Sequence, residues 1–147
     1  MESPLLIVDG HNALYGLEHF SKERERFPSK TRRELVDWLS RFQSISEYAV
    51  IVVFDGRQRQ RAVEGGDEGE ALVIYSREGE SADAVIERLA MSQAKKRRVV
   101  VASDDRLIAH CVVDSGGEAL RLVGLVELVD GELAKWRGDW GIKGSCR

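Results

Sequence analysis

The chain has 147 residues and a formal net charge of −3 at pH 7, which is the length of one compact domain and not the charge of a protein that coats nucleic acid nonspecifically. Hydrophobic residues make up 43% and charged residues 32% of the chain, a globular balance that excludes a disordered protein. The sequence contains neither an apolar run near the roughly 18 residues of a membrane span nor the regions of a secretion signal. We therefore expect a cytoplasmic protein without membrane contact, with one domain over residues 1–140 and a flexible tail over residues 141–147.

Five apolar runs predict the strands of one sheet. Residues 5–8 and 50–54 are apolar without interruption, residues 71–75 form a further strand, and residues 99–102 repeat the uninterrupted pattern. Residues 119–123 are a weaker strand that we expect at an edge. Uninterrupted apolar runs are typical of parallel strands that helices cover on both faces.

Apolar residues at helical spacing separate these strands. The polar segments 16–33 and 56–70 predict loops. Strands that alternate with helices predict right-handed crossovers and a three-layer α/β/α sandwich around a mostly parallel sheet. The four helical stripes are Leu35, Trp38, Leu39 and Phe42; Ala82, Val85, Ile86, Leu89 and Ala90; Leu107, Ile108, Cys111 and Val112; and Leu125, Leu128, Val129, Leu133 and Trp136.

Four aspartates fall at equivalent places along this pattern. Asp9, Asp55 and Asp104 stand at the ends of apolar strands, and Asp83 follows the 71–75 strand at the start of a helix. The carboxyl ends of parallel strands line one edge of an open sheet, where ligands bind. The four carboxylates are therefore expected to converge on that edge.

Each of these acids also has a purely structural explanation. Asp83 could act as a first-turn acid behind a Ser81 N-cap, and Asp104 could act in the same way behind a Ser103 N-cap. The pairs Asp9-Gly10 and Asp55-Gly56 could be turn signals. The joint occurrence of all four acids favours a site over these separate explanations.

A divalent cation is the expected partner of such a cluster. Carboxylates at close range repel one another unless a cation neutralises them, and Mg²⁺ or Mn²⁺ prefers oxygen ligands. Such an ion can activate water and stabilise the charge that develops in phosphodiester cleavage. The sequence has no histidine pair, cysteine cluster or HExxH motif, which disfavours a zinc hydrolase.

Four segments together carry a family resemblance. LLIVDGHNAL, VIVVFDG, EGESADAVIERL and VVVASDDRLI resemble, in order and approximate spacing, the YacP-like branch of the NYN group of PIN-like ribonucleases. The similarity extends over roughly residues 5–135. It implies a PIN-like sheet with the five predicted strands ordered 3-2-1-4-5, and an endoribonuclease that uses Mg²⁺ or Mn²⁺ to cleave single-stranded RNA. It also makes messenger RNA and the ribosome candidate partners.

The resemblance implies roles for individual residues. By motif, Asp9, Asp83 and Asp104 are the catalytic, metal-binding acids. Asn12 of the DGHN segment would act with them, orienting a carboxylate or touching the scissile phosphate. Asp55 would be an additional or outer metal ligand. The remaining match is the small hydroxyl residue before the last acid, Ser103, which we assign to the RNA-binding set.

Basic residues flank the acidic edge. Arg57, Arg59 and Arg61 follow Asp55, while Lys30, Arg32 and Arg33 lie at the start of the first helical stripe. Both segments lead away from the carboxyl ends of strands, so the pattern predicts a track for the RNA backbone. The alternative is a solvated, charged loop, and the glutamates within residues 16–33 favour it.

Other functions fit less well. A haloacid-dehalogenase phosphatase needs a second aspartate two residues after the first, where this chain has His11. A receiver domain needs an acidic pair after the first strand and a lysine after the last, and neither is present. A catalytically silent RNA- or ribosome-binding module with a PIN-like fold stays open as an alternative.

Overall fold

The computed structural model describes residues 2–23 and 25–139 and contains one six-stranded sheet. The strand order is β3-β4-β2-β1-β5-β6. Neighbouring strands are parallel except β3, which pairs antiparallel with β4. The strands are β1 (Leu5–Asp9), β2 (Ala49–Phe54), β3 (Ala62–Gly65), β4 (Leu72–Tyr75), β5 (Val99–Ala102) and β6 (Glu118–Leu120). The order predicted for the five expected strands is thus confirmed, with β3 added at one edge.

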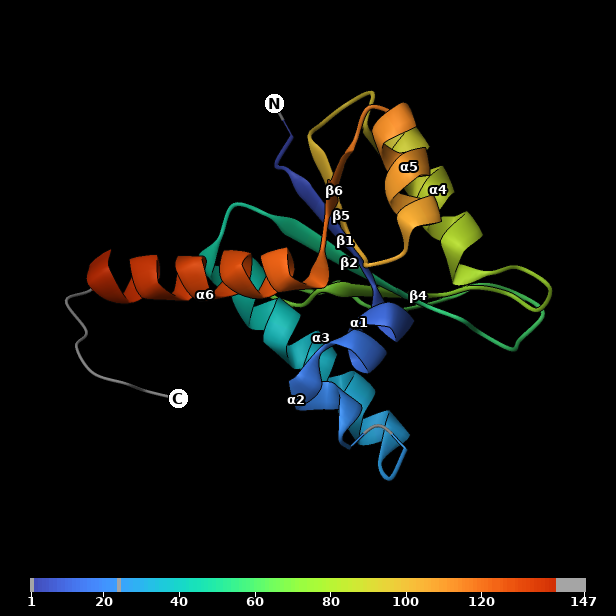
Figure 1. Cartoon of the computed structure of the whole chain (residues 1–147), viewed down its shortest axis with the longest axis horizontal. Helices are drawn as coiled ribbons and strands as arrows, with labels where there is room; N and C mark the ends of the chain where they lie inside the picture. Colours follow the sequence, from blue (N-terminus) through green and yellow to red (C-terminus); the bar gives the residue numbers. More distant parts are fainter. Residues whose placement is uncertain (1, 24, 140–147) are drawn as a thin grey trace.

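Helices cover both faces of the sheet, as the predicted sandwich requires (Figure 1). On one face, Leu6 and Val8 of β1 join a core with the first three helices and the last; on the other, Leu5 and Ile7 pack with the two helices between β4 and β6. This two-sided burial explains why β1 is apolar at every position before Asp9. The helices are α1 (Gly10–Gly16), α2 (Glu18–Ser21), α3 (Pro28–Ile45), α4 (Ala82–Gln93), α5 (Arg106–Asp114) and α6 (Leu122–Asp139).

Three segments differ from the sequence-based expectation. The predicted loop 16–33 contains α2 and the first six residues of α3, where Pro28 takes an N-terminal position that suits its fixed φ angle. The predicted loop 56–70 contains β3. The predicted strand 119–123 ends at Leu120, and α6 begins two residues later.

Among the described helices, none combines the length and the apolar character needed to cross a membrane. The tail predicted over residues 141–147 lies outside the described residues.

Candidate active site at the carboxyl edge of the sheet

The site lies where the chain changes direction across the sheet. From β1 the chain passes to β2 on one side, and it returns later to β5 on the other side of β1. The carboxyl ends of β1 and β5 therefore form a topological switch point, the usual place for a ligand in an open α/β sheet. Asp9 ends β1, and Ser103 follows β5.

A buried hydrogen bond joins these two strand ends. The Ser103 hydroxyl donates to Asp9 Oδ2 over 2.9 Å, and each residue is only 5% exposed. Burial raises the pKa of the Asp9 carboxyl most, and the negative charges of Asp83 and Asp105 raise it further, against the opposing hydrogen bonds from Ser103 and Asn12. Asp9 is thus a carboxylate held in an environment that does not neutralise its charge.

Asp83 faces the same group of acids from the start of α4. Burial raises the pKa of its carboxyl, and so do the charges of Asp105, Asp55 and Glu87. The Ser81 hydroxyl caps α4 by accepting from the Ala84 amide over 3.1 Å, so the predicted cap exists together with the acidic cluster. Helix capping alone does not account for an aspartate that lies beside other aspartates.

Asp55 contacts the N-terminus of α4, the helix that carries Asp83. Its Oδ1 accepts a hydrogen bond from the Ala82 amide over 2.8 Å, which brings the end of β2 to the N-terminus of α4.

The glycines after the two strand-end acids are required by close packing and not by turns. A Cβ on Gly10 would lie 2.4 Å from the Phe54 ring, and one on Gly56 would lie 2.0 Å from the Ser76 carbonyl oxygen.

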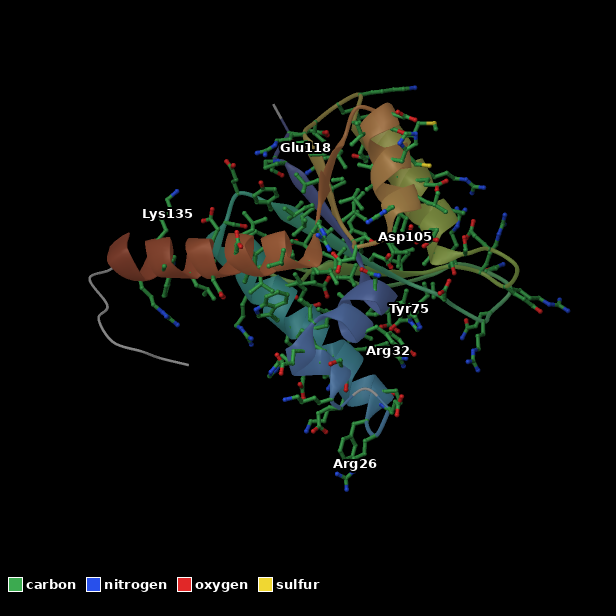
Figure 2. The ribbon with its side chains drawn as sticks, viewed as in Figure 1. Arg26, Arg32, Tyr75, Asp105, Glu118 and Lys135 are labelled. Carbon is green, nitrogen blue, oxygen red and sulfur yellow. The ribbon has the colours of Figure 1, made fainter. Side chains whose placement is uncertain are left out.

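The two consecutive aspartates after β5 have different surroundings. Asp105 caps α5, with Oδ1 accepting from the amides of Leu107 over 2.8 Å and Ile108 over 3.4 Å. Figure 2 shows it at the end of α5 that faces α1 and the start of α4. Since its charge acts on both Asp9 and Asp83, Asp105 belongs to the acidic group. The alternative in which Ser103 caps α5 is excluded, because Asp105 is the N-cap of that helix.

Asp104 is turned toward α6. Its Oδ1 accepts from the Leu122 amide over 2.9 Å and lies 3.7 Å from Arg121 Nε. The Asn12 side-chain oxygen accepts from the Asp104 backbone amide over 2.8 Å. Asn12 therefore links α1 to the segment after β5, while the Asp104 carboxylate fixes the start of α6.

The donor chemistry of the cluster fits a hard divalent cation. Every candidate ligand is a carboxylate oxygen, and the pKa values of Asp9 and Asp83 are both raised, first by loss of solvent contact and then by the charges of neighbouring acids. Within residues 2–23 and 25–139, no three side chains of the metal-binding types form a ready group around one point. Mg²⁺ often keeps several water ligands and needs only one or two direct carboxylates, so water-mediated contacts would complete such a site.

The predicted basic residues are divided between two places. Arg57 and Arg59 are exposed in the loop after Asp55, but Arg61 is held by Glu80 through its Nε over 2.8 Å. Arg33 is exposed on α3. All three arginines reach solvent, but Arg61 is fixed by Glu80 whereas Arg57 and Arg59 are not held in this way.

The start of α3 reaches the end of β4. Burial raises the Tyr75 pKa most, and the charge of Glu64 raises it further while that of Arg32 lowers it; Figure 2 shows Arg32 and Tyr75 close together. The neighbouring Lys30 lies 3.8 Å from Glu34 in an exposed ion pair. Sequence reasoning did not identify Tyr75, and the only signal for it was its position at the end of an apolar strand.

Known proteins resemble the chain in both sequence and fold. The profile of the YacP-like NYN domain matches residues 6–137. A point mutant of Rae1 (YacP) from Bacillus subtilis superposes with a TM-score of 0.74 at 23% identity, over 89% of this chain and 77% of that one. A second structure of Rae1 (YacP) from Bacillus subtilis gives 0.72 at 24% identity, over 92% and 78%. The comparison with curated proteins found no match. At these identities the structural similarity establishes the fold alone.

Proposed function

Because this chain belongs to the YacP-like NYN domain family and is thus a nuclease-like, RNA-related domain, we propose that it is a metal-dependent endoribonuclease that cleaves single-stranded RNA. The observation that carries the proposal is the buried Asp9 at the switch point together with Asp83 at the start of α4, because neighbouring aspartates raise the carboxyl pKa of both. A buried aspartate with further aspartates close to it is costly for a fold that has no use for it, and Asp9 is such a residue, 5% exposed beside the charges of Asp83 and Asp105. Perturbed acids in one place are typical of functional sites.

The proposed cofactor is Mg²⁺ or Mn²⁺. The acids that would hold it are the predicted Asp9, Asp83, Asp104 and Asp55, and we add Asp105 because its charge acts on both Asp9 and Asp83. When bound, such an ion supplies an activated water and stabilises the charge that develops on the phosphate and the leaving oxygen. Ser103 acts through Asp9, whose carboxylate it orients by its hydrogen bond. Asn12 acts through the backbone at Asp104.

The direct test is incubation of the protein with mixed single-stranded RNAs and Mn²⁺, followed by mapping of the ends. We expect internal cleavage that EDTA abolishes. The second candidate, a silent RNA- or ribosome-binding module, is favoured by the finding that the described side chains form no ready three-ligand group. RNA retention without cleavage at any Mn²⁺ concentration would support that module and reject the nuclease.

The family resemblance extends the proposal to messenger RNA on cytoplasmic ribosomes. A nuclease that acts there should sediment with ribosomes carrying messenger RNA. Its cleavage of the same message should be faster in the translated than in the free state. Equal cleavage in both states would reject the ribosome as a partner and leave the nuclease proposal intact.

The two aspartates after β5 are expected to differ in a matched comparison. Asp104→Ala removes the acceptor for the Leu122 amide and should cost about 1 kcal/mol of unfolding free energy, as loss of a helix cap does. Asp104→Asn keeps an acceptor oxygen and should retain most of that stability while losing cleavage. The measurements are urea unfolding and RNA cleavage in Mn²⁺. Parent-like cleavage by Asp104→Asn would remove Asp104 from the proposed metal ligands. Loss of cleavage in Asp105→Asn would then identify Asp105 as the ligand after β5.

Arg57 and Arg59 are expected to bind RNA and not to take part in the chemistry. Both are exposed in the loop that follows Asp55, so replacing them together with Gln should weaken RNA binding. On a single strand, the log–log salt slope should fall by about 0.7 for each phosphate that these arginines neutralise in the parent. Affinity is measured by fluorescence anisotropy in EDTA at several salt concentrations. An unchanged slope would mean that the two side chains are only solvated.

A further inference from the structure

Three arginines from separate segments surround one glutamate beside the acidic site. Glu80 accepts from Arg61 through both carboxylate oxygens, one of them over 2.8 Å. Arg88 Nη1 of α4 lies 3.3 Å from Glu80 Oε2, and Arg77 Nε lies 4.0 Å from the same oxygen. We call these four residues the Glu80 cluster. Its members come from the loop before β3, the loop after β4, and α4.

The charges in the Glu80 cluster do not balance. One carboxylate faces three guanidinium groups, so the cluster carries an excess of two positive charges. The Glu80 side chain is 7% exposed, whereas those of Arg61, Arg77 and Arg88 are 41%, 53% and 64% exposed. Each guanidinium has five N–H donors, and the single enclosed carboxylate cannot use most of them. The remaining donors are available to an anion from solvent.

Glu80 is built to stay ionised inside this group. The hydrogen bond from Arg61 is the largest cause that lowers the pKa of its carboxyl to about 2. The loop that carries it is also fixed by the backbone: the Glu80 amide donates to the Arg77 carbonyl over 3.0 Å, and the Glu78 amide donates to the Gln58 carbonyl over 2.6 Å. The glutamate therefore holds the arginines from a defined position.

The cluster is adjacent to the acidic site along two segments. Ala82, two residues after Glu80, donates its amide to Asp55 Oδ1 over 2.8 Å, and Asp83 follows directly. Arg61 lies in the same loop as Asp55, six residues further on. An RNA strand that approaches the acids meets repulsion from their charges, and a nearby cationic group offsets it.

We propose that Glu80 is a positioning residue that holds Arg61, Arg77 and Arg88 as a binding site for a phosphate of the RNA backbone flanking the acidic site. The inference rests on the proposed function for the identity of its ligand. Guanidinium groups match phosphate oxygens in a paired, planar geometry, and three of them can contact one or two successive phosphates. Glu80 itself touches no RNA and acts only through the arginines.

The test is whether replacing Glu80 strengthens or weakens RNA binding. Removal of a negative charge should strengthen RNA binding if Glu80 is only an acid near the site. Glu80→Gln should instead weaken binding of a fluorescein-labelled single-stranded RNA by at least about threefold, because the arginines lose the group that orders them. Glu78→Gln removes the same charge from an exposed neighbour and should leave binding unchanged or slightly tighter. Anisotropy in EDTA measures binding without cleavage.

A second pair of variants tests the inference even if Glu80→Gln has a local folding defect. Arg77→Gln and Arg88→Gln alter exposed side chains, and each should lower the log–log salt slope by about 0.7. The matched control, Lys96→Gln, loses one positive charge before β5, at the opposite edge of the sheet, and should not lower the slope. Equal effects of Glu80→Gln and Glu78→Gln together with unchanged slopes for the arginine variants, or no RNA binding by the parent, would overturn the inference.

Cleavage in Mn²⁺ separates this inference from the proposed function. Cleavage by the parent, with Glu80→Gln binding RNA as Glu78→Gln does and the arginine variants keeping the parent's salt slope, would reject the Glu80 cluster and leave the nuclease proposal intact. Loss of binding in Glu80→Gln, with no cleavage by the parent under any condition, would support the phosphate site and reject the nuclease.

Discussion

Asp9→Asn is expected to reduce RNA cleavage at least about a hundredfold and to make the metal-free protein more stable. The substitution keeps the shape of the side chain and an oxygen that can accept from Ser103, but it removes the buried charge. That charge is unfavourable in the folded protein because burial and the repulsion from Asp83 and Asp105 raise the Asp9 pKa. We expect the melting temperature in EDTA to rise by about 3 °C, which corresponds to roughly 1 kcal/mol for a chain of this size.

The stability gain should depend on pH in a defined direction. A carboxyl whose pKa is higher in the folded than in the unfolded chain binds its proton more tightly in the folded state. Its contribution is fully present below the unfolded pKa and is lost as the pH rises through the folded one. The parent in EDTA should therefore lose stability from about pH 4 upward, and Asp9→Asn should lose less.

Thermal melts in EDTA across this pH range, together with cleavage assays in Mn²⁺, check both parts of the Asp9 prediction. Asp37→Asn on α3 is the matched control, since it makes the same chemical change at an exposed residue. Near-parent cleavage by Asp9→Asn would remove Asp9 from the catalytic group. A lower melting temperature in EDTA would show that the Asp9 charge is stabilised by its surroundings.

The sequence was sufficient to predict the sheet because its central strands are buried on both faces. Leu6 and Leu5 of β1 are 0% and 2% exposed and belong to opposite cores. Such burial leaves an uninterrupted apolar run, which is visible without an alignment. The predicted order of the five strands and the layers of helices are confirmed.

Edge and connecting elements could not be predicted in the same way. β3 forms through its antiparallel pairing with β4 and not through burial, and Val63 at its centre is 61% exposed. The segment that contains it therefore has no alternation of apolar and polar residues. The start of α3 could not be predicted for a similar reason. Its one buried residue before Arg32 and Arg33 is the polar Thr31, so this part of the helix shows no apolar residues at helical spacing.

For the site, the sequence predicted convergence but not orientation. The rule that the carboxyl ends of parallel strands share an edge placed Asp9, Asp55 and Asp83 correctly in one neighbourhood. The choice between Asp104 and Asp105 depends on the direction of each side chain. That direction is set by Leu122, 18 residues further along the chain, and by the start of α5. The capture of Arg61 by Glu80 likewise depends on a contact that no spacing in the sequence shows.

The products of cleavage are expected to carry 5′-phosphate and 3′-hydroxyl ends, and activity is expected to be lost completely in EDTA. When water attacks the phosphorus in line, the bond to the 3′ oxygen breaks. That oxygen gains a proton and ends the upstream product, and the phosphate stays on the 5′ oxygen of the downstream product. The neighbouring 2′-hydroxyl takes no part. An all-carboxylate site with a divalent ion suits this reaction, since the leaving oxygen is stabilised directly.

The competing reaction, attack by the 2′-hydroxyl, needs a general base and a general acid on opposite sides of the phosphate, commonly two histidines. The chain has three histidines, and they lie on three different helices. His11 packs against Tyr15, and His19 packs against Phe20. The third, His110, lies 3.5 Å from Asp114 on the exposed side of α5. No two of them are placed as a pair.

End mapping after cleavage of a labelled single-stranded RNA distinguishes the two reactions. A ligase that requires a 5′-phosphate should join the downstream product, and the upstream product should be extended by a polymerase that requires a free 3′-hydroxyl. His11→Ala serves as the control, because it removes the histidine nearest in sequence to Asp9 and should change neither the ends nor the need for Mn²⁺. A 2′,3′-cyclic phosphate, or full activity in EDTA, would overturn the metal mechanism together with the roles proposed for the aspartates.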